Sequence, residues 1–312
     1  MLRVALLVSG CILLLLQRSV LPLSSNTQFV IFLIGILLLG VPHGAADLLV
    51  ATQNAGHSKK TFSKFRFFTV YISHLLLFAV TLWFFPVSGN ILFILFAAYH
   101  FGETDLSQFK TNTVIGKLFV ISYGLLIVSV ILLHHFEEVK PLFQMFTAGK
   151  ENSIFINWLD LNRYLIISVS GILFFTTAFM YFLMNRNTGT HDTGEFLIRF
   201  AVILLILFNL PPLLGFTFYF VVWHSVLSLN NIIAYLRKND SHTINRITKE
   251  IILYSVLAIG GIFLFGLTGF MFISSNAIVG YLILGLAVLT APHMQIMHDM
   301  YKSLHKITPA DN

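Results

Sequence analysis

Long apolar segments alternate with short polar ones along almost the whole chain. A helix needs about 20 mostly apolar residues to cross the hydrocarbon core of a bilayer, and ten segments approach this length. The pattern therefore predicts an all-α fold, a polytopic transmembrane helix bundle that forms a single integral-membrane domain over residues 1–312. The predicted spans cover residues 3–17, 28–50, 67–86, 91–108, 115–134, 163–184, 197–214, 216–236, 251–273 and 276–299.

The first predicted span is short and follows Arg3, as the apolar part of a signal peptide also does. It has no convincing small-x-small cleavage site and ends at Arg18, so we expect a span that is retained. Further along the chain, the Pro211–Pro212 pair separates the seventh and eighth spans, because proline interrupts a helix.

The composition agrees with a membrane protein. Hydrophobic residues make up 57% of the chain and charged residues only 10%. A soluble domain carries about 25% charged residues, so lipid must be the solvent for most of this surface. The single cysteine, Cys11, lies in an apolar run, which excludes an internal disulfide framework and a cysteine-based metal site.

The formal net charge of +6 would suggest nucleic acid for a soluble protein. Here the basic residues lie between apolar segments and report membrane orientation instead, so we expect no nucleic-acid partner. With ten spans, the basic segments 57–66 and 237–249 fall on one side, which the positive-inside rule assigns to the cytoplasm. The acidic segment 135–162 falls on the other side. This predicts a multi-pass protein of the cell (inner) membrane with both termini cytoplasmic.

Four of the histidines inside predicted spans stand out by their motifs: His43, His100, His224 and His293. His74 lies alone in the third span, where a histidine is more often a hydrogen-bonded packing residue than a ligand. Ionisable groups inside a bilayer are expensive, so each needs a partner or a function. These four lie on the second, fourth, eighth and tenth spans, which all run in the same direction. They therefore fall at comparable heights, in the middle or cytoplasmic half of the membrane. The pattern favours one shared metal site; the alternative is four separate polar contacts between helices.

Two carboxylates follow these histidines at helical spacing. Asp47 comes four residues after His43, and Glu103 comes three after His100, so each pair can share a helix face. A carboxylate that accepts one ring N–H fixes the tautomer and leaves the other nitrogen available to a metal. Ligation by nitrogen alone suits iron, copper, zinc or nickel, and the residues by themselves do not choose among these metals.

At these positions the chain resembles the Brp/Blh family of membrane β-carotene 15,15'-dioxygenases. The resemblance extends from residue 42 to residue 293, and the matching pieces follow the order of the family. They are Pro42-His43-Gly44-Ala45 with Asp47, His100-Phe101-Gly102-Glu103 with Asp105, Trp223-His224-Ser225, and Pro292-His293.

The resemblance implies a carotenoid-cleaving oxygenase that uses O2 to break the central double bond of β-carotene, or of a related carotenoid, and forms retinal. It implies a non-haem iron, Fe(2+), with His43, His100 and His224 as ligands, and it makes a retinal-binding rhodopsin a natural partner. One position departs from the family pattern. A further histidine commonly stands four residues after the first histidine of the tryptophan-histidine motif, where this chain has Ser228. Either His293 completes the site, or three histidines suffice, or the activity is lost or altered.

A long polyene needs an apolar tunnel. Candidate lining residues near the histidines are Phe101, Phe218, Phe220, Trp223, Met294 and Met297. Ordinary lipid-facing packing is the other interpretation of such phenylalanines. The glycines after His43 and His100 would let substrate or backbone approach closely, or simply let helices pack.

Other functions compete with the dioxygenase hypothesis. A transporter could use the His, Asp and Glu residues as an ion relay, and a haem protein could use two histidines as axial ligands. A membrane desaturase with two irons would need HxxxH and HxxHH boxes, which are missing from the sequence. A non-catalytic homologue that binds carotenoid or retinal remains an alternative because of Ser228.

Overall fold

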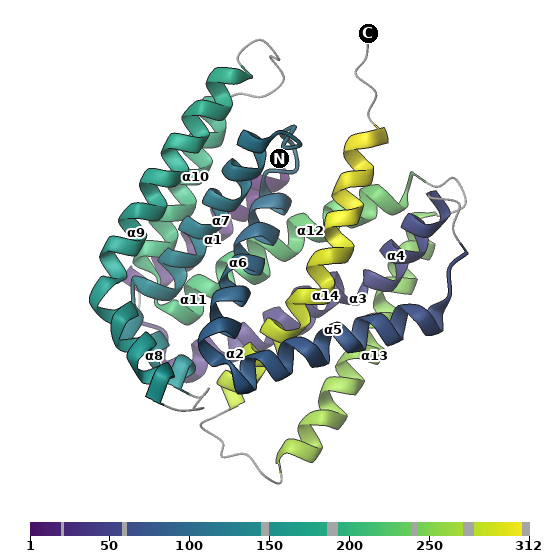
Figure 1. Ribbon diagram of the computed structural model, residues 1–312, viewed down its shortest axis with the longest axis horizontal. Coiled ribbons are helices and arrows are strands. Elements are labelled where there is room, and N and C mark those ends of the chain that lie inside the picture. The colour runs from purple at the N-terminus through teal and green to yellow at the C-terminus, as the bar shows by residue number, and fades with distance from the viewer. Residues whose placement is uncertain are drawn as a thin grey trace. The chain divides into compact units, whose positions relative to one another are not determined.

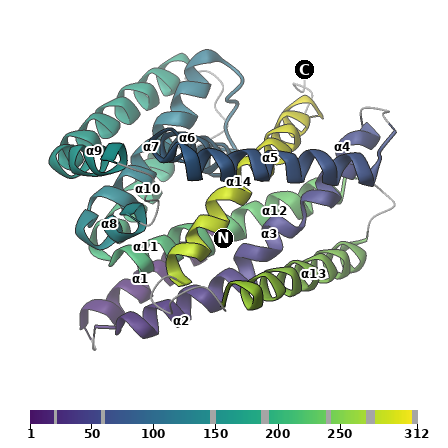
Figure 2. The same cartoon turned by 60° about the horizontal axis from the view of Figure 1, so that its bottom comes forward.

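The predicted all-α fold is confirmed. The computed structural model describes residues 1–19, 22–57, 61–144, 150–185, 193–238, 243–270 and 278–307, and every regular element within these ranges is a helix (Figures 1 and 2). Parts of both basic segments, residues 58–60 and 239–242, lie outside this description. The same is true of residues 271–277, where the last two predicted spans meet.

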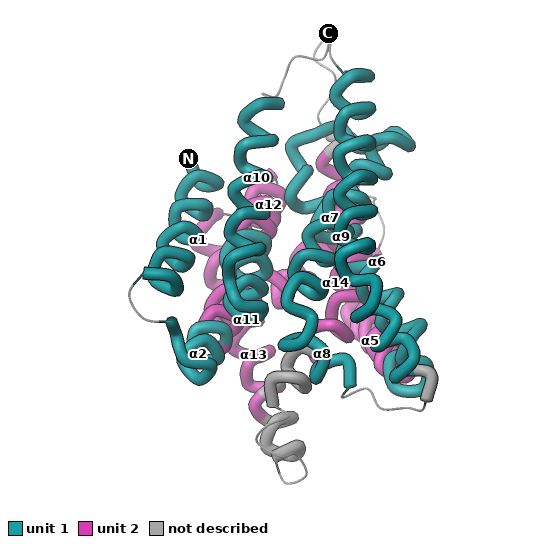
Figure 3. The backbone as a smooth tube through the Cα atoms, turned by 90° about the vertical axis from the view of Figure 1, so that its left-hand side faces the viewer, with its two compact units in different colours: residues 1–32, 81–224 teal, residues 33–80, 225–312 magenta. Residues whose placement is uncertain are grey.

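Two compact units share the chain, and Figure 3 draws them in different colours. Unit 1 comprises residues 1–32 and 81–224, and unit 2 comprises residues 33–80 and 225–312. The single domain stays a prediction. The helices wholly within unit 1 are α1 (Leu2–Ser19), α6 (Pro86–Asp105), α7 (Val114–Leu133), α8 (Phe136–Gln144), α9 (Lys150–Met184), α10 (Thr193–Asn209), α11 (Pro212–Phe216) and the π-helix η3 (Thr217–His224).

Unit 2 holds the π-helix η1 (Ile36–Gly40), α3 (Val41–Ala45), α4 (Asp47–His57), α12 (Ser225–Leu236), α13 (Ile244–Phe270) and α14 (Ile278–Ile307). Helices α2 (Ser25–Gly35) and α5 (Lys64–Phe84) each contribute residues to both units. Within unit 2, α13 packs along α3, as Figure 2 shows, and α14 packs against α4.

The core of unit 1 forms around α7, which contacts α6, α9 and α10. Glycines let α6 approach α7 closely: a Cβ at Gly102 would overlap the backbone oxygen of Val120, and one at Gly124 would overlap that of Ala98. Small residues at helix contacts are typical of membrane bundles. The glycine that follows His100 by two residues therefore serves helix packing.

Polar side chains join α7 to α9. The hydroxyls of Ser122 and Thr177 lie 2.6 Å apart, and those of Ser129 and Ser170 lie 3.2 Å apart. Each pair is buried, and such hydrogen bonds between helices are common where lipid offers no alternative partner.

The core of unit 2 brings together α4, α12, α13 and α14. Hydrogen bonds accompany the apolar contacts: Asn231 donates to the hydroxyl of Tyr301 at 3.2 Å, and Tyr235 hydrogen bonds the side chain of Asn54. The buried members of this core are Ala46, Val50, Ile232, Tyr235, Leu236, Ile247, Ile251, Met297, Met300 and Tyr301.

Six of the described helical segments are long and apolar enough to cross a membrane: Leu2–Ser19, Ser25–Gly56, Lys64–Phe84, Val114–Leu133, Asn152–Met184 and Pro212–Leu236. The other four predicted spans fall on α6, α10, α13 and α14, and the total of ten stays a prediction. The chain breaks between α10 and α11 at the prolines that the sequence singled out. Helix α8 was not predicted, because its residues lie in a segment that the polar pattern assigned to a loop.

Candidate metal centre

Unit 1 brings two of the predicted ligands into direct contact. His100 lies on α6 and His224 is the last residue of η3, and their Nε2 atoms are 3.1 Å apart. The ring centroids are 4.7 Å apart at an interplanar angle of 75°. His100 is only 2% exposed and His224 is fully buried. Two residues that are 124 positions apart in the sequence thus form one buried histidine pair.

Aromatic rings surround this pair. The ring of Phe101 lies 4.7 Å from that of His224, and Phe220 stacks on His224 at 5.9 Å with an interplanar angle of 16°. These contacts give His224 an apolar, ring-lined surrounding within unit 1. They also place two of the predicted tunnel residues beside a predicted ligand.

Both histidine motifs of the second and eighth predicted spans adjoin π-helical turns. Residues Ile36–Gly40 form η1, three residues before His43, and Thr217–His224 form η3, which ends on His224 itself. Wider helical turns of this kind are rare and occur frequently at functional sites, because they change the direction of the side chains that follow.

Asp105 anchors the π-helix that carries His224. The Oδ2 atom of this buried carboxylate accepts hydrogen bonds from Tyr123 Oη at 2.7 Å, Tyr219 Oη at 2.8 Å and Trp223 Nε1 at 2.8 Å. Arg3 donates to the backbone oxygen of Asp105 at 3.1 Å. The sequence marked Asp105 only as part of a motif, and it gave no signal for Tyr123 or Tyr219, which lie on other helices.

Unit 2 contains the second histidine pair. The rings of His43 on α3 and His293 on α14 meet edge to face, with centroids 4.9 Å apart. Nδ1 of His293 lies 2.7 Å from Oδ1 of Asp47, and Tyr71 Oη donates to Oδ2 of the same carboxylate at 3.1 Å. His43, Asp47 and His293 are all buried. Asp47 therefore orients His293, although its sequence spacing had suggested a pairing with His43.

The second predicted carboxylate, Glu103, is buried on α6 and accepts a hydrogen bond from Tyr99 Oη at 3.1 Å. Donor and acceptor are four residues apart on the same helix, which is the spacing at which helical side chains meet. Tyr99 directly precedes the His100 motif in the sequence, so this contact was within reach of pattern analysis.

The other predicted tunnel residues are scattered. Phe218 lies against Gly10 of α1 within unit 1, where a Cβ added at Gly10 would overlap its ring. The indole of Trp223 is held by Asp105. In unit 2, Met297 is part of the buried core and Met294 is half-buried. The tunnel as a whole stays a prediction.

Ser228, which stands where the family commonly has a further histidine, lies on α12 and is fully buried. Among the described residues its Oγ has no hydrogen-bond partner. The Ser228 hydroxyl thus stands at the sequence position of the missing imidazole and makes no hydrogen bond to another described residue.

The donor set fits a transition metal. Two nitrogens bound to one ion at about 2.0–2.1 Å, with an angle near 90°, lie about 3 Å apart, which matches the separation of the His100 and His224 Nε2 atoms. In unit 2, an Asp47 carboxylate that accepts the Nδ1 proton of His293 leaves Nε2 of that ring able to bind a metal.

These features define the class: in its described part, a helical protein with several helices apolar enough to cross a membrane and two buried histidine pairs. The family model for Beta-carotene 15,15'-dioxygenase matches residues 34–301. The chain belongs to this family, which confirms the resemblance carried by the histidine motifs. A protein named Beta-carotene 15,15'-dioxygenase from uncultured marine bacterium 66A03 is 25% identical over 269 residues, covering 86% of this chain and 92% of the relative. No solved structure matches the chain.

Proposed function

We propose that this chain is a membrane non-haem iron dioxygenase that cleaves β-carotene, or a related carotenoid, at its central double bond to give retinal. The observation that carries the proposal is the buried His100–His224 pair, whose Nε2 atoms have the separation expected of two ligands on one ion. Family membership supplies the reaction class. Because the identity to the named relative is only 25%, the particular carotenoid and the bond that is cleaved are part of the proposal.

In this proposal His43, His100, His224 and His293 bind Fe(2+). When bound, the iron supplies open coordination positions and the electrons for reaction with O2. Imidazole nitrogens suit this metal, and His293 takes the place of the ligand that Ser228 does not provide. The comparable heights of the four residues in the predicted spans support their convergence on one ion.

The remaining polar residues orient the ligands. Asp47 holds the Nδ1 proton of His293, so that ring presents Nε2. Asp105 holds the turn that carries His224 through three hydrogen bonds. We assign Glu103 a similar orienting role on α6, where it is buried one turn after His100.

The apolar rings around His224 serve two purposes in this reaction. Phe101 and Phe220 exclude water from the iron ligand, and they offer an apolar surface to a polyene, which has no groups that need hydrogen bonds. The substrate and the product are both soluble in the bilayer, which agrees with a cell (inner) membrane location. In this proposal a retinal-binding rhodopsin is the partner that receives the product.

Iron content tests the ligand set directly. The purified full chain should retain about one iron per chain after reconstitution with Fe(2+) under anaerobic conditions, and His100→Ala and His224→Ala should each lose most of it. His134→Ala is the matched control, because His134 follows the last residue of α7 and belongs to none of the histidine motifs. Equal iron content in all three variants would contradict the proposal.

A non-catalytic homologue that binds retinal or carotenoid is the second candidate function, and Ser228 favours it. Iron content separates the two functions, because a binding protein has no need of the metal. Stoichiometric binding of retinal by an iron-free chain that forms no retinal from β-carotene would support this alternative.

A further inference from the structure

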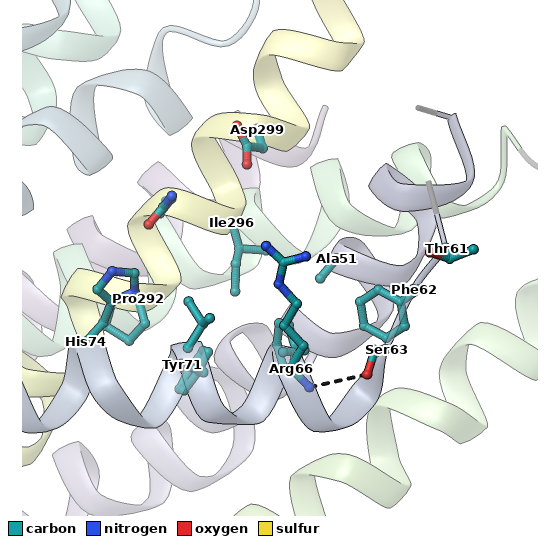
Figure 4. Close-up of a pocket in the computed structure, with 13 residues that line it drawn as sticks. Ala51, Thr61, Phe62, Ser63, Arg66, Tyr71, His74, Pro292, Ile296 and Asp299 are labelled. Atoms are coloured by element: carbon teal, nitrogen blue, oxygen red, sulfur yellow. Dashed lines mark hydrogen bonds between the residues drawn. The ribbon is translucent and has the colours of Figure 1, made fainter. Parts of the chain in front are cut away.

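A cavity of about 320 Å³ lies within unit 2 between α5 and α14, with Ala51 of α4 at one side (Figure 4). We refer to it as the α5–α14 pocket. Its apolar wall is formed by Phe62, Phe67, Val70 and Ile296. The volume is at the lower end of the range of about 300–1,000 Å³ that small-molecule sites occupy.

The polar side of the pocket offers hydrogen-bond donors. Arg66, His74 and Gln295 line it, and Figure 4 shows the Arg66 side chain extending from α5 toward Ile296 and Ala51. Asp299 adds one negative charge to the single positive charge of Arg66. The charges of these two side chains balance. The lining suits an uncharged polar group that accepts hydrogen bonds better than a phosphate, which needs an excess of positive charge.

One side chain separates this pocket from the buried carboxylate of unit 2. Tyr71 lines the pocket and donates its hydroxyl to Asp47 at 3.1 Å, and Asp47 in turn contacts His293 at 2.7 Å. Pro292, the neighbour of His293 in the chain, also belongs to the lining. The pocket thus adjoins two residues to which the proposed function gives roles at the iron.

We propose that the α5–α14 pocket binds the aldehyde product of the reaction, an uncharged apolar chain that ends in a carbonyl group. The inference rests on the proposed function, in which O2 adds one oxygen atom to each carbon of the broken double bond and so forms two aldehydes. The carbonyl accepts hydrogen bonds from the Arg66 and Gln295 side of the pocket. The hydrocarbon lies against Phe62, Val70 and Ile296. The volume suits the half-length product rather than the whole carotenoid.

Binding of tritiated all-trans-retinal to the purified full chain in detergent, without O2 and without carotenoid, tests this inference. Val70→Trp fills the pocket and should weaken retinal binding by about tenfold or more, the equivalent of 1.4 kcal/mol. Val80→Trp is the matched control, because Val80 lies on the same helix outside the pocket lining and is 48% exposed against 47% for Val70. Val80→Trp should bind retinal as the wild type does.

A second variant tests the polar side. Gln295→Leu removes a hydrogen-bond donor while keeping the size of the side chain, and it should weaken retinal binding several-fold with little effect on binding of the hydrocarbon β-carotene. A wild-type chain that binds no retinal, or Val70→Trp and Val80→Trp variants that bind it equally well, would overturn the assignment of the pocket.

Failure of this inference and failure of the proposed function give different results. If carotenoid cleavage is normal while Val70→Trp leaves retinal affinity unchanged, the pocket assignment is wrong and the dioxygenase proposal stands. If Val70→Trp abolishes retinal binding but the wild type cleaves no carotenoid, the pocket binds retinal and the proposed reaction is wrong.

Discussion

Trp223 donates its indole N–H to Asp105 at 2.8 Å, and the next residue along the same helix is His224. The carboxylate that ends α6 therefore holds the turn that presents a proposed iron ligand. Tyr123 and Tyr219 donate to the same oxygen. A buried carboxylate with three donors on one oxygen is a costly group that a bundle keeps for a structural or functional reason.

Removal of this anchor should weaken metal binding. Asp105→Ala leaves three buried donors without their acceptor, and we expect a loss of iron affinity of about 10- to 100-fold, as is typical for groups that orient metal ligands. Asp105→Asn keeps one acceptor oxygen and should retain more of the affinity. Chelator competition on the purified protein measures the effect.

The control for Asp105 is Asp160→Ala in the same unit, a carboxylate that pairs with Lys140 at 3.0 Å on the segment that includes α8 and the start of α9. Its iron affinity should equal that of the wild type. If Asp105→Ala and Asp160→Ala bound iron equally well, the positioning role of Asp105 would be wrong.

Asp47 should act on His293 in a similar way. Asp47→Ala removes the acceptor of the Nδ1 proton, so the ring loses its fixed tautomer, and iron affinity should again fall by about 10- to 100-fold. Tyr71→Phe leaves the contact between Asp47 and His293 in place and should have a smaller effect. Spectra of the ferrous nitrosyl complex should also differ between wild type and Asp47→Ala, and identical spectra and affinities would contradict an orienting role for Asp47.

The glycines between α6 and α7 give a prediction on stability. Gly124→Ala places a Cβ against the backbone oxygen of Ala98. The two helices must then separate, at a cost of about 1–3 kcal/mol. Gly171→Ala on α9 is the matched control, because nothing that the structure describes lies within 4 Å of the added methyl. It should be neutral or stabilising by up to about 1 kcal/mol.

Thermal unfolding in detergent compares these two variants. The melting temperature should fall for Gly124→Ala and stay constant or rise for Gly171→Ala. Equal melting temperatures would show that α6 and α7 do not pack as closely as the structure has them.

The fold was largely predictable, because the length of an apolar run sets the length of a membrane helix. Each predicted run overlaps at least one described helix, and the Pro211–Pro212 pair marks a break between helices. Helix α8 was missed for the same reason, since its residues are too polar to resemble a span. The π-helical turns η1 and η3 could not be predicted, because the pattern of apolar residues does not distinguish them from α-helical turns.

The site was predictable only in part. The position of the histidines inside apolar spans identified them, yet local spacing paired Asp47 with His43, four residues away. The observed partner, His293, is 246 residues away in the chain, and no spacing rule reaches that far. Spacing also could not predict the contacts of Asp105 with Tyr123, Tyr219 and Trp223, although Trp223 itself stood in a motif. Tertiary contacts, not helical periodicity, decide which carboxylate orients which ring.

The formation of retinal from β-carotene tests the proposed function most directly. Cells that produce β-carotene would express the wild-type chain, His43→Ala or His100→Ala, and chromatography would measure retinal and residual carotenoid. We expect retinal with the wild type and none with either variant, at equal amounts of folded protein in the membrane. Persistence of β-carotene with a folded, iron-replete wild-type chain would contradict the dioxygenase proposal for this substrate.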